Sequence, residues 1–430
     1  MTRSEYPLAS WRRAFVQWAI SALACASVLR GATPAAANAT ASTSAGTIAW
    51  VGARIFPAPE APVIDRGVVL VTDGTITAVG SADQVEVPAE ARIIDAAGLS
   101  LLAGFWNCHV HFTEPKWWDA ANRPAEQLRE DLQQMLTRYG FTTAVDLASL
   151  IDNTTRLRAR IESGEVPGPR ILTAGSALYP VEGVPYYVTD TAPELATLLP
   201  TPATAEEAVA AVQRTVDGGA DVIKLFLVTG VRGGDRSIEL RSMSPEVVRA
   251  AVQHAHRQGR LVFAHPSTVK GLNAALDHEV DVLAHTIQDT ENWNATVVGR
   301  MRDAGIALVP TLHLFSRARD FPAVQRQVRD YVAAGGDVLF GTDVGFLSDY
   351  VAVSRELKLL ADAGLSFPQL LATLTTAPAT RFGVGDRSGR IAPGADADLV
   401  LVAGDPREDV EALLRVRSTV RAGRIIFERP

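Results

Sequence analysis

Cysteine is almost absent from this chain of 430 residues, which contains only Cys25 and Cys108. Cys25 lies in an apolar N-terminal stretch with the features of a removable leader, so a single thiol would remain in the mature chain. One thiol cannot close an internal disulfide, which excludes the class of small secreted domains held together by disulfides. Because 47% of the residues are hydrophobic, the chain can build a large apolar core instead.

Positive charge is also in short supply. The chain has 41 lysines and arginines against 48 aspartates and glutamates, a formal net charge of −7 at pH 7. This balance argues against a nucleic-acid partner and offers no basic patch for an anionic membrane. Beyond the N-terminal stretch, no segment has the roughly 20 uninterrupted apolar residues of a membrane span. We therefore expect no stable membrane span in the mature chain and a small molecule as its partner.

Residues 1–38 have the layout of a secretory signal peptide. Arg12-Arg13 precede the apolar stretch Ala14–Leu29, and small-residue cleavage sites follow at Ala35–Ala37 and Ala37–Ala39. The paired arginines also resemble a twin-arginine export signal, a route that carries proteins already folded. We expect this segment to be removed and the mature chain to be exported, periplasmic or secreted. A general-secretion leader and an uncleaved anchor are the alternatives.

The rest of the chain shows two patterns. Residues 46–100 and 388–430 read as short strands separated by turns, and Asp73-Gly74 is a hairpin signal. We predict that both chain ends form one small β-sandwich domain. Residues 101–387 instead alternate apolar runs with helical segments, which predicts an α/β fold with a (β/α)8 TIM-type barrel.

Eight apolar runs are the expected barrel strands: Leu101–Cys108, Thr142–Leu147, Arg170–Ala174, Asp221–Phe226, Leu261–Ala264, Val280–Ala284, Ala307–Thr311 and Asp337–Gly341. A doubly wound open sheet is the structural competitor. No Gly-x-Gly-x-x-Gly sequence follows any of these runs, so a dinucleotide-binding sheet is not favoured.

Metal-ligating residue types gather where the predicted strands end. His109 and His111 close the first run, and residues two apart in a strand point to the same face. The ends of later runs carry His265, His285 and Asp343. A single histidine at a strand end is more often a hydrogen-bonded core residue, and an aspartate there can simply cap a loop. Because a barrel places its chemistry at the carboxyl ends of its strands, the coincidence predicts a metal site.

Lys224 interrupts the apolar run Asp221–Phe226. A buried ammonium without a partner destabilises a fold by about 3–5 kcal/mol. A purely structural role for this lysine is therefore disfavoured. An ammonium has donors but no lone pair, and it cannot ligate a cation. Desolvation and nearby metal charge would depress its pKa and leave a neutral amine.

The order HxH, Lys, His, His, Asp on strands one, four, five, six and eight resembles the amidohydrolase superfamily. The stretch Gly389–Val400 is similar to that family's return into its small domain. Ile223-Lys224 through Thr229-Gly230, Ser244-Pro245-Glu246 and Ala255-His256 resemble the branch of metal-dependent prolidases, Xaa-Arg dipeptidases and ochratoxin-type amidases. The resemblance covers nearly all of residues 46–430.

The resemblance implies a set of roles. Two divalent metal ions, with zinc as the default for histidine and carboxylate ligands, would be held at the strand ends. His109, His111 and Asp343 would bind the more buried ion, and His265 and His285 the second. Lys224, carbamylated by carbon dioxide, would bridge the two ions together with a hydroxide. Asp343 would accept the hydroxide proton and return it to the leaving nitrogen. Without the carbamate the site would hold one metal.

Candidate substrate-binding residues lie in loops after the strands. His313, Tyr187 and Arg232 are the candidates, with Arg232 able to hold a substrate carboxylate, although solvated loop arginines are the commoner case. Trp117 and Trp118 are candidates for an apolar entrance. We predict a hydrolase that cleaves an amide bond in a dipeptide or an N-acyl amino acid. A cyclic amide hydrolase, a mononuclear deaminase and a catalytically silent binding protein are the alternatives, and the sequence leaves open whether the chain forms a homo-oligomer.

Overall fold

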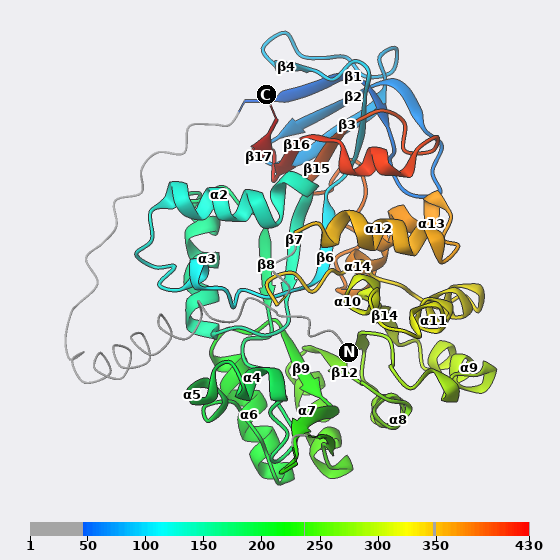
Figure 1. Cartoon of the computed structure of the whole chain (residues 1–430). Helices are drawn as coiled ribbons and strands as arrows, with labels where there is room; N and C mark the ends of the chain where they lie inside the picture. The colour runs from blue at the N-terminus through cyan, green and yellow to red at the C-terminus, as the bar shows by residue number, and fades with distance from the viewer. Residues whose placement is uncertain (1–45, 236, 347–349, 430) are drawn as a thin grey trace, which may run out of the picture.

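The computed structural model describes residues 46–235, 237–346 and 350–429. The predicted signal peptide, residues 1–38, lies outside this range. Figure 1 shows the strands of the two chain ends together at the top of the molecule, with the helix-rich remainder below them. No helix among the described residues is long and apolar enough to cross a membrane.

The two chain ends share one mixed sheet of eight strands. Its strands are β1 (Ile48–Ile55), β2 (Ile64–Thr72), β3 (Thr75–Ser81), β4 (Arg92–Asp95), β5 (Leu99–Ala103), β15 (Leu399–Ala403), β16 (Val416–Arg421) and β17 (Arg424–Glu428). The order is β17-β16-β15-β5-β1-β2-β3, with β4 paired to β1. We expected two facing sheets in a sandwich. Instead β1 pairs with β2, β4 and β5, and this branching makes one continuous hydrogen-bonded sheet whose apolar residues form two clusters.

The predicted first barrel strand, Leu101–Cys108, is wrong as a single element. The structure divides it into β5 in the sheet of the chain ends and β6 (Phe105–Val110) in the parallel part of the fold. The division falls at Gly104, whose backbone N–H donates to the Asp398 carbonyl at 2.7 Å. A side chain at this position would overlap Thr142, because its Cβ would lie 2.2 Å from the Thr142 hydroxyl. Both halves are almost wholly buried, so hydrophobicity alone does not mark the boundary.

Two parallel sheets form the centre of the molecule. The first has the order β6-β7-β8, and the second has the order β14-β13-β12-β9. Their further strands are β7 (Phe141–Asp146), β8 (Arg170–Thr173), β9 (Val222–Phe226), β12 (Leu261–His265), β13 (Val282–Ala284) and β14 (Ala307–Val309). A separate antiparallel hairpin follows β9 and consists of β10 (Val228–Arg232) and β11 (Ile238–Ser242).

Helices alternate with the parallel strands. The longer ones are α2 (Ala125–Met135), α3 (Ile151–Glu162), α6 (Ala205–Asp217), α7 (Pro245–Arg257), α8 (Val269–Asp277), α9 (Ala295–Asp303), α11 (Phe321–Ala333), α12 (Ala352–Asp362), α13 (Phe367–Leu374) and α14 (Thr376–Arg381). Shorter turns are α4 (Tyr186–Thr189), α5 (Pro193–Ala196), α10 (Leu312–Phe315), η2 (Pro115–Trp117), η3 (Thr137–Tyr139), η4 (Thr290–Asn292) and η5 (Val410–Leu414). Side-chain caps fix several starts; the Ser244 hydroxyl, for example, accepts the Val247 N–H at the start of α7.

Hydrogen bonds outside the regular strands link the two parallel sheets on both sides. On one side the Asp221 N–H donates to the Thr173 carbonyl at 2.8 Å, which connects β8 to the start of β9. On the other side the segment 337–344 lies between β14 and β6. Its contacts include Leu308 N–H to Asp337 O at 2.9 Å and Cys108 N–H to Phe340 O at 2.8 Å. The hydrogen-bonded order therefore returns to β6, the strand where it began.

The predicted eighth strand, Asp337–Gly341, does not form a regular strand. The segment pairs with its neighbours only through isolated bridges, Val338 to Leu308 and Val344 to Val110. Two residues beyond this segment, Asp343 is left-handed with φ +60°, and a residue in this conformation does not continue a regular ladder.

The interior apolar cluster is built mainly from strand residues and includes Trp106, Cys108, Phe263 and Leu339. Cys108 is completely buried, and this burial raises the pKa of its thiol. The cluster fills the space below the strand ends that carry His265 and His285, so these polar side chains have an apolar floor.

Candidate metal centre

Asp343 is the point on which two of the predicted ligands converge. Its Oδ1 lies 3.1 Å from His109 Nε2 and 2.8 Å from His111 Nε2. The two imidazole Nε2 atoms are 3.2 Å apart. All three residues are buried, and the His-x-His spacing thus places both rings on one side of the backbone, as expected for a strand.

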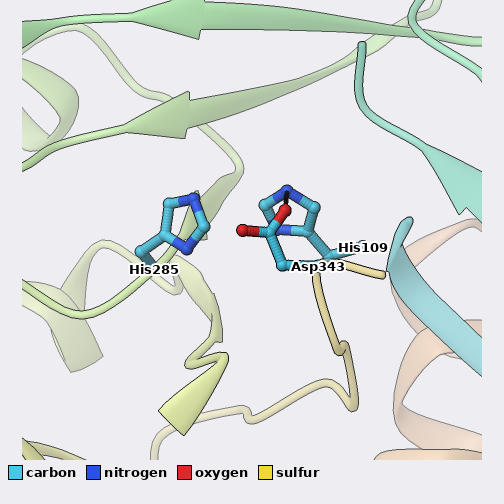
Figure 2. Close-up of side chains that lie close together, drawn as sticks. All are labelled: His109, His285 and Asp343. Atoms are coloured by element: carbon cyan, nitrogen blue, oxygen red, sulfur yellow. Dashed lines mark ion pairs between the residues drawn. The ribbon is translucent and has the colours of Figure 1, made fainter. Parts of the chain in front are cut away.

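The other two histidines lie next to this group. The ring centroids of His109 and His285 are 4.7 Å apart, and those of His265 and His285 are 4.6 Å apart. His109, His285 and Asp343 each offer a ligand atom, and these atoms all lie within 4.8 Å of one another. Figure 2 shows these three side chains pointing toward one another. One site therefore receives polar side chains from four parts of the chain: β6, β12, the segment after β13 and the segment after Gly341.

Contacts behind the rings determine which nitrogen faces the site. His111 Nδ1 contacts the Ala148 carbonyl at 3.1 Å, and His285 Nδ1 contacts the Thr311 hydroxyl at 2.7 Å. Both contacts leave Nε2 for the interior of the site. His265 is held differently, because its ring stacks on Phe226 at 4.7 Å and its buried Nδ1 has no hydrogen-bond partner among the described residues. Contacts of this kind orient metal-binding imidazoles in proteins.

Lys224 lies in the middle of β9 and is 1% exposed. Its Nζ has no hydrogen-bond partner among the described residues and lies 5.3 Å from the centre of the Phe226 ring. Burial lowers the pKa of the Lys224 ammonium to about 7, while the charge of Asp343 acts in the opposite direction. A substantial share of this lysine is therefore a neutral amine with a free lone pair at neutral pH.

Burial also favours the neutral form of three of the histidines, His109, His265 and His285. It lowers the pKa of His109 to about 4 and that of His265 to about 3, and it lowers the pKa of His285 well below its usual value. Burial opposes ionisation of Asp343, but His109 and His111 outweigh it and hold the pKa of this carboxyl well below its ordinary range. Neutral imidazoles, a carboxylate and an amine are donors that suit a divalent cation, so the residues fit a metal.

The candidate substrate residues have different surroundings. Tyr187, in α4, packs its ring on Phe346 with centroids 5.1 Å apart, and burial raises the pKa of its phenol well above the usual value. His313 is buried at the start of α10. Arg232 forms an ion pair with Asp190 at 2.9 Å and lies over the Tyr186 ring, so the candidate carboxylate ligand already has an anionic partner.

The entrance predicted from the tryptophans is wrong for Trp117. This residue is completely buried, and its ring packs edge-on against Phe112 with centroids 5.0 Å apart.

Three further residues at the site were not singled out by sequence: Thr311, Phe226 and Glu356. Glu356 is fully buried in α12, and burial raises the pKa of its carboxyl to about 8 against the effect of two backbone N–H donors. Its place among the apolar residues of an amphipathic helix was the one available signal.

Residues 100–426 match the model of the Amidohydrolase family. This match spans most of the chain, so the chain belongs to the amidohydrolase family, whose members are metal-dependent. It is an enzyme, a hydrolase that acts on amide carbon–nitrogen bonds.

Individual proteins narrow the comparison. Ochratoxinase of Aspergillus niger is 25% identical over 355 residues, which cover 72% of each chain. The crystal structure of that ochratoxinase superposes with a TM-score of 0.73 at 20% identity, over 90% of this chain and 96% of that chain. A crystal structure of a Xaa-Pro dipeptidase with bound methionine in the active site gives a TM-score of 0.76 at 22% identity, over 89% of this chain and 100% of that one. These structures imply a TIM-type barrel with a second domain.

Proposed function

We propose that this enzyme cleaves the amide bond of a dipeptide or an N-acyl amino acid at a centre of two divalent metal ions. The observation that carries the proposal is the gathering of four imidazoles, one carboxylate and an unpartnered lysine amine around the parallel strands; the imidazoles of His109, His111 and His285 are buried and that of His265 is partly buried. The similarity to ochratoxinase and to a Xaa-Pro dipeptidase supports an amide substrate of this type.

We assign the residues as follows. His109, His111 and Asp343 hold the first ion, and His265 and His285 hold the second. The neutral amine of Lys224 would form a nitrogen–carbon bond with carbon dioxide and release one proton, which would leave a carbamate with two oxygens able to hold metal. Divalent ions, with zinc as the default, supply a water of lowered pKa and an electrophile for the substrate carbonyl.

Asp343 moves the proton in this proposal. Its carboxylate persists at neutral pH and can accept a proton from the attacking water and deliver it to the leaving nitrogen. The buried floor formed by the interior cluster excludes bulk water from below, which strengthens each charge interaction in the site. We keep Tyr187 and His313 as candidates for contacts with the substrate.

The division of the chain follows the same proposal. Residues 101–387 would form the hydrolase barrel, and residues 46–100 with 388–430 the small β-domain. The observed sheet of the chain ends extends to Ala103, so we place the boundary between the two parts at Gly104. Residues 1–38 would be a signal peptide that directs the enzyme out of the cytoplasm.

Metal content and a substrate screen test the proposal together. We expect about two metal ions per chain and turnover of members of dipeptide and N-acyl amino acid libraries. One metal per chain with turnover restricted to ring amides or aminated bases would support the alternative hydrolase or deaminase and overturn the proposal. A Lys224→Ala variant should lose activity and regain part of it with bicarbonate and short carboxylic acids, whereas Lys270→Ala, on the separate helix α8, should behave like the unaltered enzyme.

A further inference from the structure

Glu356 is a charged residue type in a place that the proposed chemistry does not use. It lies in α12, is 0% exposed, and its two hydrogen bonds go to backbone N–H groups and not to any of the six proposed ligands. Both of its carboxyl oxygens are engaged: Oε1 accepts the Leu312 N–H at 2.9 Å and Oε2 accepts the His313 N–H at 2.7 Å. A buried side chain with two such bonds fixes the backbone that it touches.

The backbone held by Glu356 has an unusual conformation. Leu312 and His313 begin the short turn α10, and the residue before them, Thr311, is left-handed with φ +48° and ψ +49°. A β-branched residue rarely adopts this conformation, which persists only where surrounding contacts enforce it. The two N–H groups after Thr311 would be buried donors without an acceptor if the Glu356 carboxyl were absent.

The Thr311 hydroxyl transmits this arrangement to the site. Its Oγ1 donates to the Pro310 carbonyl at 2.8 Å and lies 2.7 Å from His285 Nδ1. A hydroxyl has only one proton, so an Oγ1 that donates to Pro310 must accept at its contact with His285. The proton of the neutral imidazole is therefore on Nδ1, and the lone pair of Nε2 is directed away from Thr311.

We infer that Glu356 is a positioning residue, which acts through Thr311 to fix the Nδ1–H tautomer and ring orientation of His285. The inference rests on the proposed function in one respect, since it gives His285 its purpose as a ligand of the second ion. The relay itself is a property of the protein without metal, and it joins α12, α10 and the segment after β13.

The first test needs no metal. In protein labelled with 15N-histidine and stripped of metal, the His285 ring should give the signals of the Nδ1–H tautomer, assigned by their loss in His285→Asn. Thr311→Val and Glu356→Gln should each turn this signal into a mixture of tautomers, whereas Thr311→Ser, which keeps the hydroxyl, should preserve it. A His285 signal that is unchanged in both Thr311→Val and Glu356→Gln would overturn the inference.

The second test uses cobalt(II) as the probe. We expect Thr311→Val and Glu356→Gln to weaken the second cobalt site about 10- to 100-fold, the scale known for residues that support metal ligands. The first site should stay within a few-fold of the unaltered protein. Thr419→Val is the matched control, because Thr419 is equally buried and loses a similar bond, from its hydroxyl to the Thr137 carbonyl at 2.7 Å, in the sheet of the chain ends.

The two tests separate the two ideas. If the unaltered protein binds fewer than two cobalt ions while the tautomer changes occur as described, the proposed function fails and the relay stands. If two ions bind equally well in every variant, the relay has no role in the metal site and the inference fails. The double variant should be no worse than the more affected single variant, because both changes interrupt one path; additive losses would contradict a shared path.

Discussion

At the residue scale, Asp343 has two roles. Its Oδ1 contacts the imidazoles of His109 and His111, and in the proposed mechanism its carboxylate also transfers the proton. Asparagine keeps the shape and one carbonyl oxygen but has no ionisable group. We expect Asp343→Asn to keep much of its metal and to lose turnover by about 10²- to 10⁴-fold, the usual contribution of a positioned acid or base. Metal analysis and kcat of the same preparation give the answer, and near-normal turnover in a metal-replete variant would refute this role.

The lowered pKa of Lys224 predicts how the free energy of unfolding changes with pH. In the folded, metal-free protein, burial lowers the pKa of the Lys224 ammonium to about 7 from its ordinary value of 10.5, which we take for the unfolded chain. Between these values the unfolded chain binds more protons, so stability contributed by this group rises with pH and is lost as the pH falls toward 7, by at most about 1.4 kcal/mol per pH unit.

Denaturant unfolding at pH 7, 8 and 9 measures this effect, with chelator present and carbon dioxide removed. The unaltered protein should gain stability relative to Lys224→Met as the pH rises. Parallel profiles for the two proteins would show that the lysine is not shifted in the folded state.

The sequence predicts the proposed metal ligands of the candidate site better than it predicts the residues that position those ligands. Histidine and lysine at the ends or in the middle of apolar runs are conspicuous because burial of a polar group needs a reason. Glu356 offers only its place among the apolar residues of an amphipathic helix, and Thr311 offers no signal. The carboxyl acts on a backbone 44 residues away in sequence, and the left-handed conformation of Thr311 goes against its residue type.

At the scale of the element, the segment that carries Asp343 is held by single contacts instead of a regular ladder. The Asn107 amide donates to the Thr342 hydroxyl at 2.8 Å, and the His111 N–H donates to the Val344 carbonyl at 2.8 Å. Gly345 follows at φ +95°, and a Cβ there would lie 1.8 Å from the His111 carbonyl oxygen. The close approach of this loop to the HxH segment therefore requires glycine.

Gly345→Ala should separate these two segments. Gly364→Ala is the matched control, because Gly364 also has a left-handed φ, +99°, but open space around it. The control should lose about 1–2 kcal/mol from backbone strain alone, and Gly345→Ala should lose at least about 2 kcal/mol more, as expected for a large steric conflict. Unfolding midpoints and cobalt binding measure both; equal losses in the two variants would mean that the loop adapts without cost.

The periodicity of hydrophobic residues predicts a helix or strand that has one polar face. It fails for an element whose residues are all buried. One of the helical segments expected between the apolar runs is α7, whose buried residues recur at helical spacing. In β5 and β6 nearly every residue is buried, so the pattern hides the boundary at Gly104. The predicted strand Asp337–Gly341 is apolar enough for a strand, but it pairs with its neighbours only through isolated contacts such as the bridge from Val338 to Leu308.

At the scale of the whole molecule, the two chain ends are tied to the enzyme's centre. β5 pairs with β15 in one sheet although their residues are almost 300 positions apart. Arg170, in β8, contacts Asp396 and Asp398 at 3.3 Å, which connects the parallel strands to the segment before β15. The strand-like character of both ends was visible in sequence, whereas the single branched sheet was not, because pairing partners are not encoded in alternation alone.

The predicted leader gives a prediction for the whole chain. Expressed with its own N-terminus, the protein should be recovered outside the cytoplasm with a new N-terminus close to residue 39, which N-terminal sequencing identifies. Replacement of Arg12-Arg13 by Lys-Lys should retain the protein in the cytoplasm if the twin-arginine route is used. Export of that variant at the normal level would point to the general route, and an intact N-terminus on exported protein would exclude cleavage.

In a chain produced without residues 1–38, which contain Cys25, the burial of Cys108 makes the protein its own probe of opening. The thiol is enclosed by strand residues of the interior cluster, and its raised pKa removes the reactive thiolate. An alkylating reagent can therefore modify only those molecules whose interior has opened. The rate of mass increase by one adduct would report how often the floor of the site is exposed, with and without metal, without any label being introduced.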